Sequence, residues 1–274
     1  MDRAKFFAAL RRRESGVFGT SLSQGQVRGT EAILDSCTRN RVTDPHYVAN
    51  ILAQVYHETG GYMLPIKETV YASHKDKSPS DATVIARLER AWKAGQLSWV
   101  KTPYWREGWF GRGPIQTTHY KNYLKMGTRL GVDLIRYPEE LLKPRTGADS
   151  AVIGMAEGLY TGRKLSDYAF PEDLSAPPAH HPRRIVNGKD GTDGDIAKYH
   201  RAFHSALTAA GHSAQKAPAS TREPLPPLPD TPEPETPPTG KSGGKSGIVA
   251  LVAVIGTSLA LFWDKITALI ERLF

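Results

Sequence analysis

Apolar residues recur at helical spacing through most of the first 212 positions, and this pattern predicts a mainly α fold. The segment 44–61 shows it best, because its apolar residues fall at i, i+3, i+4 and i+7, the stripe of a helix buried on one face. These residues are Val48, Ile51, Leu52 and Val55. Asp44 followed by proline is typical of a helix start, and Gly60 with Gly61 is typical of a helix end.

The same periodicity predicts several more helices. They cover residues 1–13, 23–37, 78–95, 117–130, 146–162 and 193–209. The first is short and packs Phe6, Phe7 and Leu10, and the second opens with a Ser-x-x-Gln capping box. In the helix over 117–130 we expect an inner face made of Tyr120, Tyr123, Leu124 and Leu130. The alanine- and glycine-rich helix over 146–162 is expected at the centre of the domain.

The pattern changes after residue 212. Residues 213–246 form a Pro/Gly-rich linker, with nine prolines between Pro218 and Pro238. Residues 247–263 contain no charge, which is close to the shortest length that crosses a bilayer core of roughly 30 Å. We therefore predict a C-terminal transmembrane helix there, followed by an amphipathic tail over 264–274. The alternative is a buried helix, although the linker separates this segment from any core.

Composition and charge narrow the classes of protein. The 274 residues carry a formal net charge of +8, and residues 1–212 alone hold 30 Lys and Arg against 22 Asp and Glu. A basic surface suits a polyanionic partner, or serves solubility alone. No helix-turn-helix, zinc-finger or RNA-binding motif is present, so we expect no nucleic-acid partner. The single cysteine, Cys37, excludes an internal disulfide and is expected to be a buried thiol.

Glu58 is the first candidate catalytic residue, because it falls in the last turn of the helix over 44–61. The negative end of the helix dipole and partial burial both disfavour a carboxylate there, which would raise its pKa and allow it to act as a general acid. A solvated glutamate at a helix end is the alternative. Zinc is not expected, since no second histidine follows His57 four residues on.

Four blocks in order resemble the family 19 glycoside hydrolases, the chitinases and phage endolysins of the lysozyme-like superfamily. They are the His57-Glu58-Thr59 helix end, Glu68, the run Gly111-Arg112-Gly113-Pro114-Ile115-Gln116-Thr117-Thr118 with Asn122-Tyr123, and Ile185-Val186-Asn187-Gly188. The resemblance covers roughly residues 20–212. It implies a two-lobed, lysozyme-like catalytic domain over residues 1–212.

The resemblance also implies roles for individual residues. Glu58 would protonate the leaving oxygen, Glu68 on a more polar loop would be the base, and Thr118 would help to hold the water. Residues expected to bind substrate or order the site are Gln116, Asn122, Asn187, Tyr71 and His57. The family inverts configuration, so the two carboxyl groups should lie roughly 6.5–9.5 Å apart. No metal or organic cofactor is expected.

Other patterns remain ambiguous or are rejected. The aromatic residues of 98–113 suit either a sugar platform or a loop pinned to a core. His200 and His204 are four residues apart but lack a third ligand, so a structural role is expected. The aspartates of 190–195 miss the spacing of a calcium loop, which leaves a plain turn.

The expected substrate is peptidoglycan, cleaved at β-1,4 bonds by an endolysin with muramidase action. The alternatives are a chitinase and an inactive, membrane-anchored module that binds the wall. The start of the chain is too short and too charged for a signal peptide, so the catalytic domain would remain cytoplasmic until it is released or translocated to the periplasm. Expected partners are the cytoplasmic membrane, through the C-terminal helix, and a holin that gives access to the wall.

Overall fold

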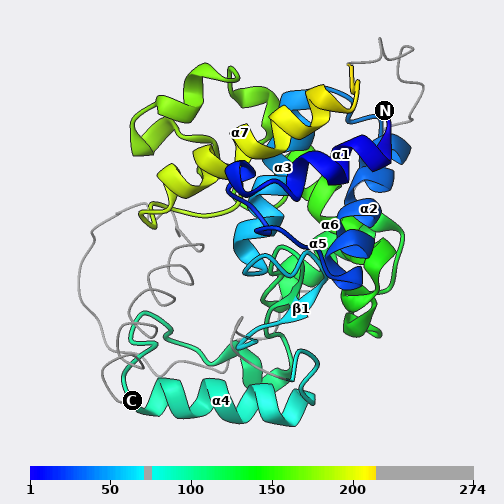
Figure 1. Cartoon of the computed structure of the whole chain (residues 1–274). Coiled ribbons are helices and arrows are strands. Elements are labelled where there is room, and N and C mark those ends of the chain that lie inside the picture. The colour runs from blue at the N-terminus through cyan, green and yellow to red at the C-terminus, as the bar shows by residue number, and fades with distance from the viewer. Residues whose placement is uncertain (71–75, 214–274) are drawn as a thin grey trace, which may run out of the picture.

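The computed structural model describes residues 1–70 and 76–213. Seven α-helices and one two-stranded sheet lie in these ranges, so the predicted mainly α class is confirmed (Figure 1). The helices are α1 (Arg3–Leu10), α2 (Gln24–Arg39), α3 (Pro45–Glu58), α4 (Asp81–Lys93), α5 (Tyr120–Leu130), α6 (Pro144–Glu157) and α7 (Asp193–Ala209). The strands are β1 (Ile66–Lys67) and β2 (Arg112–Gly113).

Helix starts follow the predicted capping residues. The Asp44 carboxylate accepts the N–H groups of His46 and Tyr47 at the start of α3, at 2.8 and 3.2 Å. Ser23 and Gln26 form the reciprocal capping box of α2. These bonds satisfy backbone donors that have no partner inside a helix, which is why both starts could be read from the sequence.

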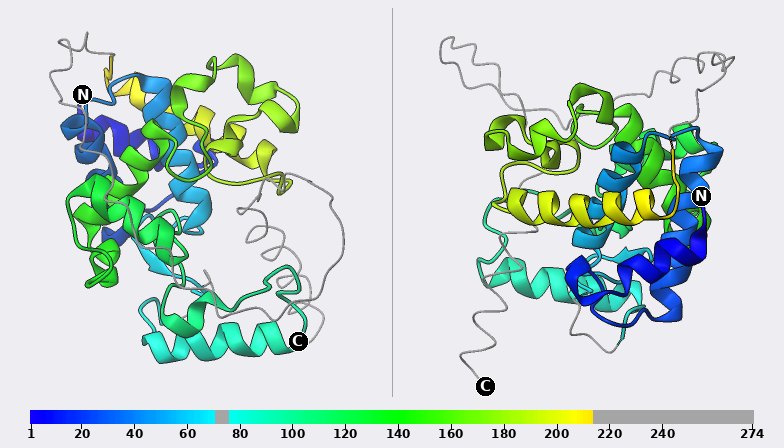
Figure 2. Two further views of the ribbon diagram at one scale, coloured as in Figure 1. Left: turned by 180° about the vertical axis from the view of Figure 1, so that it is seen from behind. Right: turned by 45° about the horizontal axis from the view of Figure 1, so that its top comes forward.

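Helix α3 lies at the centre of the main core, with α7 on one side and α2 and α6 on another (Figures 1 and 2). The prediction that α3 buries only one face is wrong in its middle, because every residue from 48 to 55 is buried. Two of these, Asn50 and Gln54, are polar. A buried polar side chain needs a partner, and that of Gln54 belongs to the candidate active site.

A second, smaller core lies around α4, which runs along the lower edge of the molecule in Figure 1. It is built from Val84 and Leu88 of α4 together with Leu97, Trp105 and Phe110. The main core and this second core are joined through the β1–β2 pair, in which Ile66 lies opposite Gly113 and Lys67 opposite Arg112.

The start of α5 and the end of α6 differ from the prediction for clear structural reasons. Helix α5 begins at Tyr120 rather than at residue 117, because Thr117 pairs with Arg112 through two backbone hydrogen bonds of 3.0 and 3.2 Å. Tyr120 is also 40% exposed, so its predicted place on the inner face is wrong, whereas Tyr123 is buried. Helix α6 ends at Glu157 rather than at residue 162, because Gly158 directly after Glu157 adopts a left-handed φ of 74°.

The predicted linker from residue 214 onward, the transmembrane helix over 247–263 and the tail over 264–274 lie outside the described residues. Within 1–70 and 76–213, no helix is both long and apolar enough to cross a bilayer.

Candidate active site

Glu68 directly follows β1, and the strand pairing brings it against Gly111. The backbone N–H of Glu68 donates to the Gly111 carbonyl at 2.7 Å, and the N–H of Gly111 donates to Glu68 Oε2 at 2.7 Å. A Cβ at position 111 would lie 2.4 Å from Oε1 of Gln116, so only glycine fits there without displacing that side chain. Two blocks that are distant in the sequence therefore meet at one carboxylate.

The environment of Glu68 differs from the predicted polar loop. The residue is only 5% exposed, and its other oxygen, Oε1, accepts the Tyr104 hydroxyl at 2.8 Å. Burial raises the pKa of Glu68, while the bonds from Gly111 and Tyr104 and the charge of Arg112 oppose that rise. The prediction of a more polar loop did not anticipate this enclosure, because Tyr104 and Gly111 reach Glu68 from 36 and 43 positions further along the chain.

Glu58 lies in the last turn of α3, as predicted, but it has a partner that the sequence did not suggest. Nη2 of Arg183 lies 2.6 Å from Glu58 Oε1, and the arginine side chain is fully buried while that of Glu58 is 11% exposed. The prediction considered only burial and the helix dipole.

Arg183 joins α3 to the segment before α7. Its Nε donates to Asp190 Oδ2 at 2.8 Å, and its Nη1 donates to Gln54 Oε1 at 2.8 Å. Gln54 precedes Glu58 by four residues, so both side chains project from the same face of α3. Although burial alone would raise the pKa of Asp190, the Arg183 guanidinium holds it below its usual value. The one sign of this network in the sequence was Gln54, a polar residue in the apolar part of the helix and four positions before Glu58.

Asn187 belongs to the same network. Its amide donates to Asp190 Oδ2 at 3.0 Å, so it is linked to Glu58 through Asp190 and Arg183. Asp190 also accepts the hydroxyl and backbone N–H of Thr192. The predicted plain turn therefore holds for Asp190, whose carboxylate is bonded internally, whereas Asp193 and Asp195 lie in the first turn of α7.

The residues of the Gly111–Tyr123 block lie on the Glu68 side. Gln116 donates to the carbonyls of Ile66 and Gly113, at 3.2 and 2.9 Å, and so holds the two strands together. The Asn122 amide donates to the Thr118 carbonyl at 2.9 Å. Gln116 and Asn122 therefore order the loop through these bonds. The predicted contacts of Gln116 and Asn122 with sugar, and of Thr118 with water, stay predictions.

His57 and Tyr71 complete the predicted set. His57 is partly buried next to Tyr199, with ring centroids 6.4 Å apart, and burial lowers its pKa, so the ring is neutral near neutral pH. Tyr71 lies outside the described residues.

Among the aromatic residues of 98–113, the structure shows the loop-pinning role, and the sugar platform stays a prediction. Trp105 and Phe110 are fully buried in the second core, which is the structural role. Trp109 packs its ring on Tyr120 and Tyr123, at 5.2 and 5.4 Å. Tyr104 is different, because its hydroxyl reaches Glu68, and sequence reasoning did not single it out for the site.

Among residues 1–70 and 76–213, no group of three or more His, Cys, Asp or Glu side chains is arranged to hold a metal ion. His200 is buried with its Nε2 3.2 Å from Nδ1 of His46, and the ring of His204 stacks on His46 at 4.0 Å. Burial lowers the pKa of His200 to about 3, so the ring is neutral and structural, as expected. Cys37 is buried, which raises its pKa to about 12 and leaves no thiolate for catalysis.

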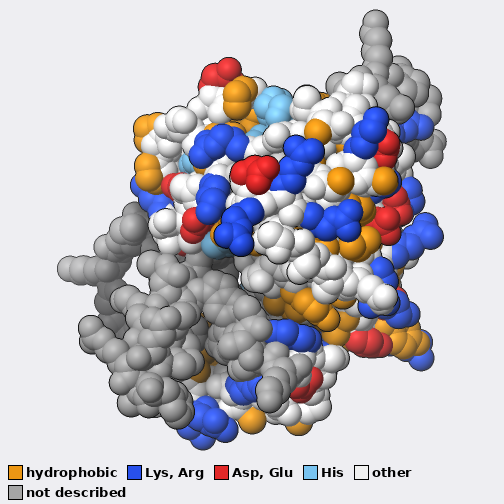
Figure 3. All heavy atoms as spheres, viewed as in Figure 1, with side chains coloured by type: hydrophobic (Ala, Val, Ile, Leu, Met, Phe, Trp, Pro, Cys, Tyr) orange, Lys and Arg blue, Asp and Glu red, His pale blue; other side chains and the backbone are white. Residues whose placement is uncertain are grey.

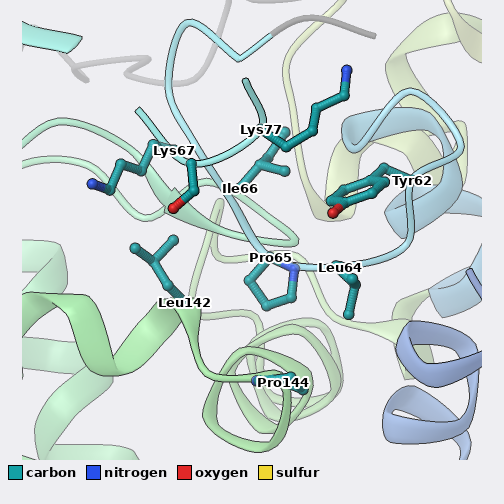
Figure 4. A pocket seen from close by; sticks show the side chains of 9 residues that line it. Tyr62, Leu64, Pro65, Ile66, Lys67, Lys77, Leu142 and Pro144 are labelled. Carbon is teal, nitrogen blue, oxygen red and sulfur yellow. The ribbon is translucent and has the colours of Figure 1, made fainter. Parts of the chain in front are cut away.

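A pocket of about 180 Å³ adjoins β1 (Figure 4). Pro65, Leu142 and Pro144 supply an apolar side, and Lys67 and Lys77 supply charge. The pocket lies beside the strand that leads to Glu68 but is lined by neither predicted carboxylate. Nothing in its lining assigns it to the reaction.

Comparisons with known proteins give a structural similarity and no match in sequence. No family model matches the chain, and neither does any curated protein. The structure is similar to that of chitinase C from Streptomyces griseus HUT6037, with a TM-score of 0.45, 19% identity, and coverage of 78% of this chain and 77% of that one. A mutant form of chitinase C gives a TM-score of 0.44 and 19% identity, with 78% and 94% covered. Because both TM-scores lie below 0.5, the function proposed next rests on the residues of the site.

Proposed function

We propose that the chain is a glycoside hydrolase with a two-lobed, lysozyme-like catalytic domain, in which Glu58 is the general acid and Glu68 the general base. The observation that carries this proposal is a pair of carboxyl groups in unlike surroundings, one paired with a buried arginine and the other enclosed by neutral donors. Two carboxyl groups whose environments differ in this way are suited to opposite roles in proton transfer.

The acid role of Glu58 follows from its helix-end position and from the resemblance to family 19, and the Arg183 network holds this carboxyl group in place. The same nitrogen, Nη2, lies 2.6 Å from Glu58 and 2.7 Å from Asp190, so one cation serves two carboxylates. Asp190 has a second cation nearby, since Nη2 of Arg184 lies 4.0 Å from its Oδ1. Asp190 is fully buried and keeps its charge, because Arg183 lowers its pKa, whereas Glu58 is partly exposed. Glu58 is the member that can exchange a proton with a substrate.

The surroundings of Glu68 suit a base. A raised pKa brings a carboxylate closer to the operating pH, which strengthens it as a proton acceptor. Glu68 would take a proton from the attacking water as the water oxygen bonds to the anomeric carbon. The glycosidic bond breaks, and the leaving oxygen takes the proton of Glu58. Thr118 would help to place the water, and a carboxyl separation of roughly 6.5–9.5 Å is expected for this inverting reaction.

Peptidoglycan is the substrate we favour, with action as an endolysin, and chitin is the alternative. Lys and Arg side chains spread over the face that bears α1 and α7 (Figure 3), and cationic surfaces favour anionic polymers such as peptidoglycan over uncharged chitin. The two similar structures are both named as chitinases, which is the alternative. An inactive wall-binding module is less suitable, since binding alone needs neither Glu58 nor Glu68.

The substrate is tested by measuring new reducing ends released from purified peptidoglycan and from colloidal chitin by the same preparation. Our proposal expects faster release from peptidoglycan. Faster release from chitin would establish the alternative, and no release from either polymer would contradict the proposed activity.

The membrane anchor at residues 247–263, and a holin that gives access to the wall, remain part of the proposal. The supporting observation is the order of parts in the sequence, a domain, a proline-rich linker and an uncharged segment. Fractionation of cells that express the full chain or a chain ending at Gly240 tests the anchor. Equal amounts of the two chains in the soluble fraction would rule it out.

A further inference from the structure

Tyr104 is the one side chain that hydrogen-bonds the Glu68 carboxylate within residues 1–70 and 76–213. It begins a short 3-10 helix, Tyr104–Glu107, and its hydroxyl lies 2.8 Å from Glu68 Oε1. The backbone N–H of Gly111 occupies Oε2, so each carboxylate oxygen has one donor. The tyrosine therefore fixes the rotation of a carboxylate that its strand has already placed.

We propose that Tyr104 is the positioning residue that sets the orientation and the proton affinity of Glu68, and that the ring of His119 holds Tyr104 in place. This inference rests on the proposed function, because it assigns roles around the same base. It adds two residues that no motif in the sequence marked.

His119 is held firmly enough to support the tyrosine ring. Its ring centroid lies 4.3 Å from that of Tyr104. Its backbone N–H donates to the Trp109 carbonyl, and the N–H of Trp109 donates to the Tyr104 carbonyl, at 2.9 and 3.2 Å. His119 also has a φ of 66°, a left-handed angle that is uncommon outside glycine and that tends to occur at functional sites.

The chemistry follows from which partner can give up a proton. Burial and the neighbouring Glu68 both raise the pKa of Tyr104, so its hydroxyl stays protonated and acts as a donor to Glu68. A donor stabilises the charged carboxylate more than the neutral acid. Loss of this bond would leave a buried carboxylate with one donor, and the pKa of Glu68 would rise further.

The direct test is Tyr104→Phe, which removes the hydroxyl and keeps the ring. A base must be ionised to act, so kcat/KM falls as the pH drops through the pKa of Glu68. We expect the acid limb of the pH profile of kcat/KM to move upward by about one to two pH units. This shift corresponds to the free energy of one hydrogen bond to a charged group. Tyr137→Phe is the matched control, because Tyr137 is 44% exposed. The acid limb of this variant's pH profile should coincide with that of the wild type.

A second readout needs no activity. The NMR signal of the Glu68 carboxyl carbon can be identified because it is missing in Glu68→Gln. The pH at which this signal titrates should be higher in Tyr104→Phe than in the wild type. An unmoved titration would overturn the inference. If Glu68→Gln instead keeps full activity, the proposed function fails, while the titration still tests the link between Tyr104 and Glu68.

The role of His119 is tested by two substitutions, which also serve if Tyr104→Phe does not fold. His119→Ala removes the ring and should shift the titration of Glu68 in the same direction by a smaller amount. His119→Phe keeps an aromatic ring and should restore the wild-type value. Equal titrations in all three proteins would show that the ring does not hold Tyr104.

Discussion

The two candidate catalytic carboxylates are held in opposite ways. Glu58 ends a helix of the main core and faces a buried cation, Arg183, at 2.6 Å. Glu68 follows a two-residue strand between the two cores, and its direct hydrogen-bond partners are the neutral groups of Tyr104 and Gly111. A charge-based network therefore supports one carboxylate, and neutral donors with burial support the other.

This difference predicts where each half of the site is sensitive. An ion network in a core fails when one charge is removed, because the remaining charges are left buried without compensation. A carboxylate enclosed by neutral donors depends on close packing and on hydrogen-bond geometry. Substitutions on the Glu58 side should therefore change stability most, and those on the Glu68 side should change the pH profile and the rate.

The largest effect on stability is expected for Arg183→Met, which takes the cation from Glu58 and leaves Asp190 with only Arg184, whose Nη2 lies 4.0 Å away. We expect the free energy of unfolding to fall by about 3–5 kcal/mol, measured by chemical denaturation. Arg163→Met is the control, since Arg163 is exposed and forms no ion pair with residues 1–70 or 76–213. A loss no larger than that of the control would mean that Arg183 does not stabilise this half of the site.

A smaller effect that depends on pH is expected for Asp190→Asn. Arg183 lowers the pKa of Asp190 below the usual 3.8, so its charge contributes stability above that value, and the contribution disappears as the pH falls through the lower folded value. At neutral pH we expect a loss of about 2–3 kcal/mol, the size of hydrogen bonds to a charged group.

The same variant should unfold like the wild type in strongly acidic solution, where both side chains are neutral. Unfolding free energies measured at neutral and at acidic pH check this. A difference that persists unchanged at low pH would indicate that Asp190 acts through packing and not through its charge.

The smallest expected change in stability lies on the Glu68 side, at Gly111→Ala. The added methyl group would lie 2.4 Å from Gln116 Oε1, so we expect a loss of about 1–3 kcal/mol and a lower rate, as the strand pair moves away from Glu68. Gly194→Ala is the control, because a Cβ there meets no atom within 4 Å. Equal behaviour of the two alanine variants would show that the close packing at Gly111 is not required.

The fold was accessible from the sequence wherever local chemistry decides it. Asp44 and Ser23 begin helices at the predicted places because they satisfy the first backbone donors. Glu58 could be placed at a helix end because Gly60 and Gly61 readily take the left-handed backbone angles that follow a helix. The start of α5 was missed because Thr117 pairs with Arg112, a contact that helical periodicity does not reveal.

The partners of the two carboxylates could not be predicted, since they come from distant segments. Arg183 reaches Glu58 across 125 positions of the chain, and Tyr104 reaches Glu68 across 36. The resemblance to family 19 glycoside hydrolases named the carboxylates but implied neither Arg183 nor Tyr104. Without these contacts, the surroundings of Glu58 were reduced to burial and the helix dipole, and those of Glu68 to a more polar loop.

The most direct test of the central claim is the release of reducing ends by Glu58→Gln and by Glu68→Gln, with Glu139→Gln as the control at an exposed position. Circular dichroism of each variant should first show the helix content of the wild type. The account predicts that each of the first two variants loses activity by a factor of about 10² to 10⁴, the usual contribution of a general acid or base, and that the control keeps it. Wild-type rates in either Glu58→Gln or Glu68→Gln would contradict the claim that these two carboxylates perform the reaction.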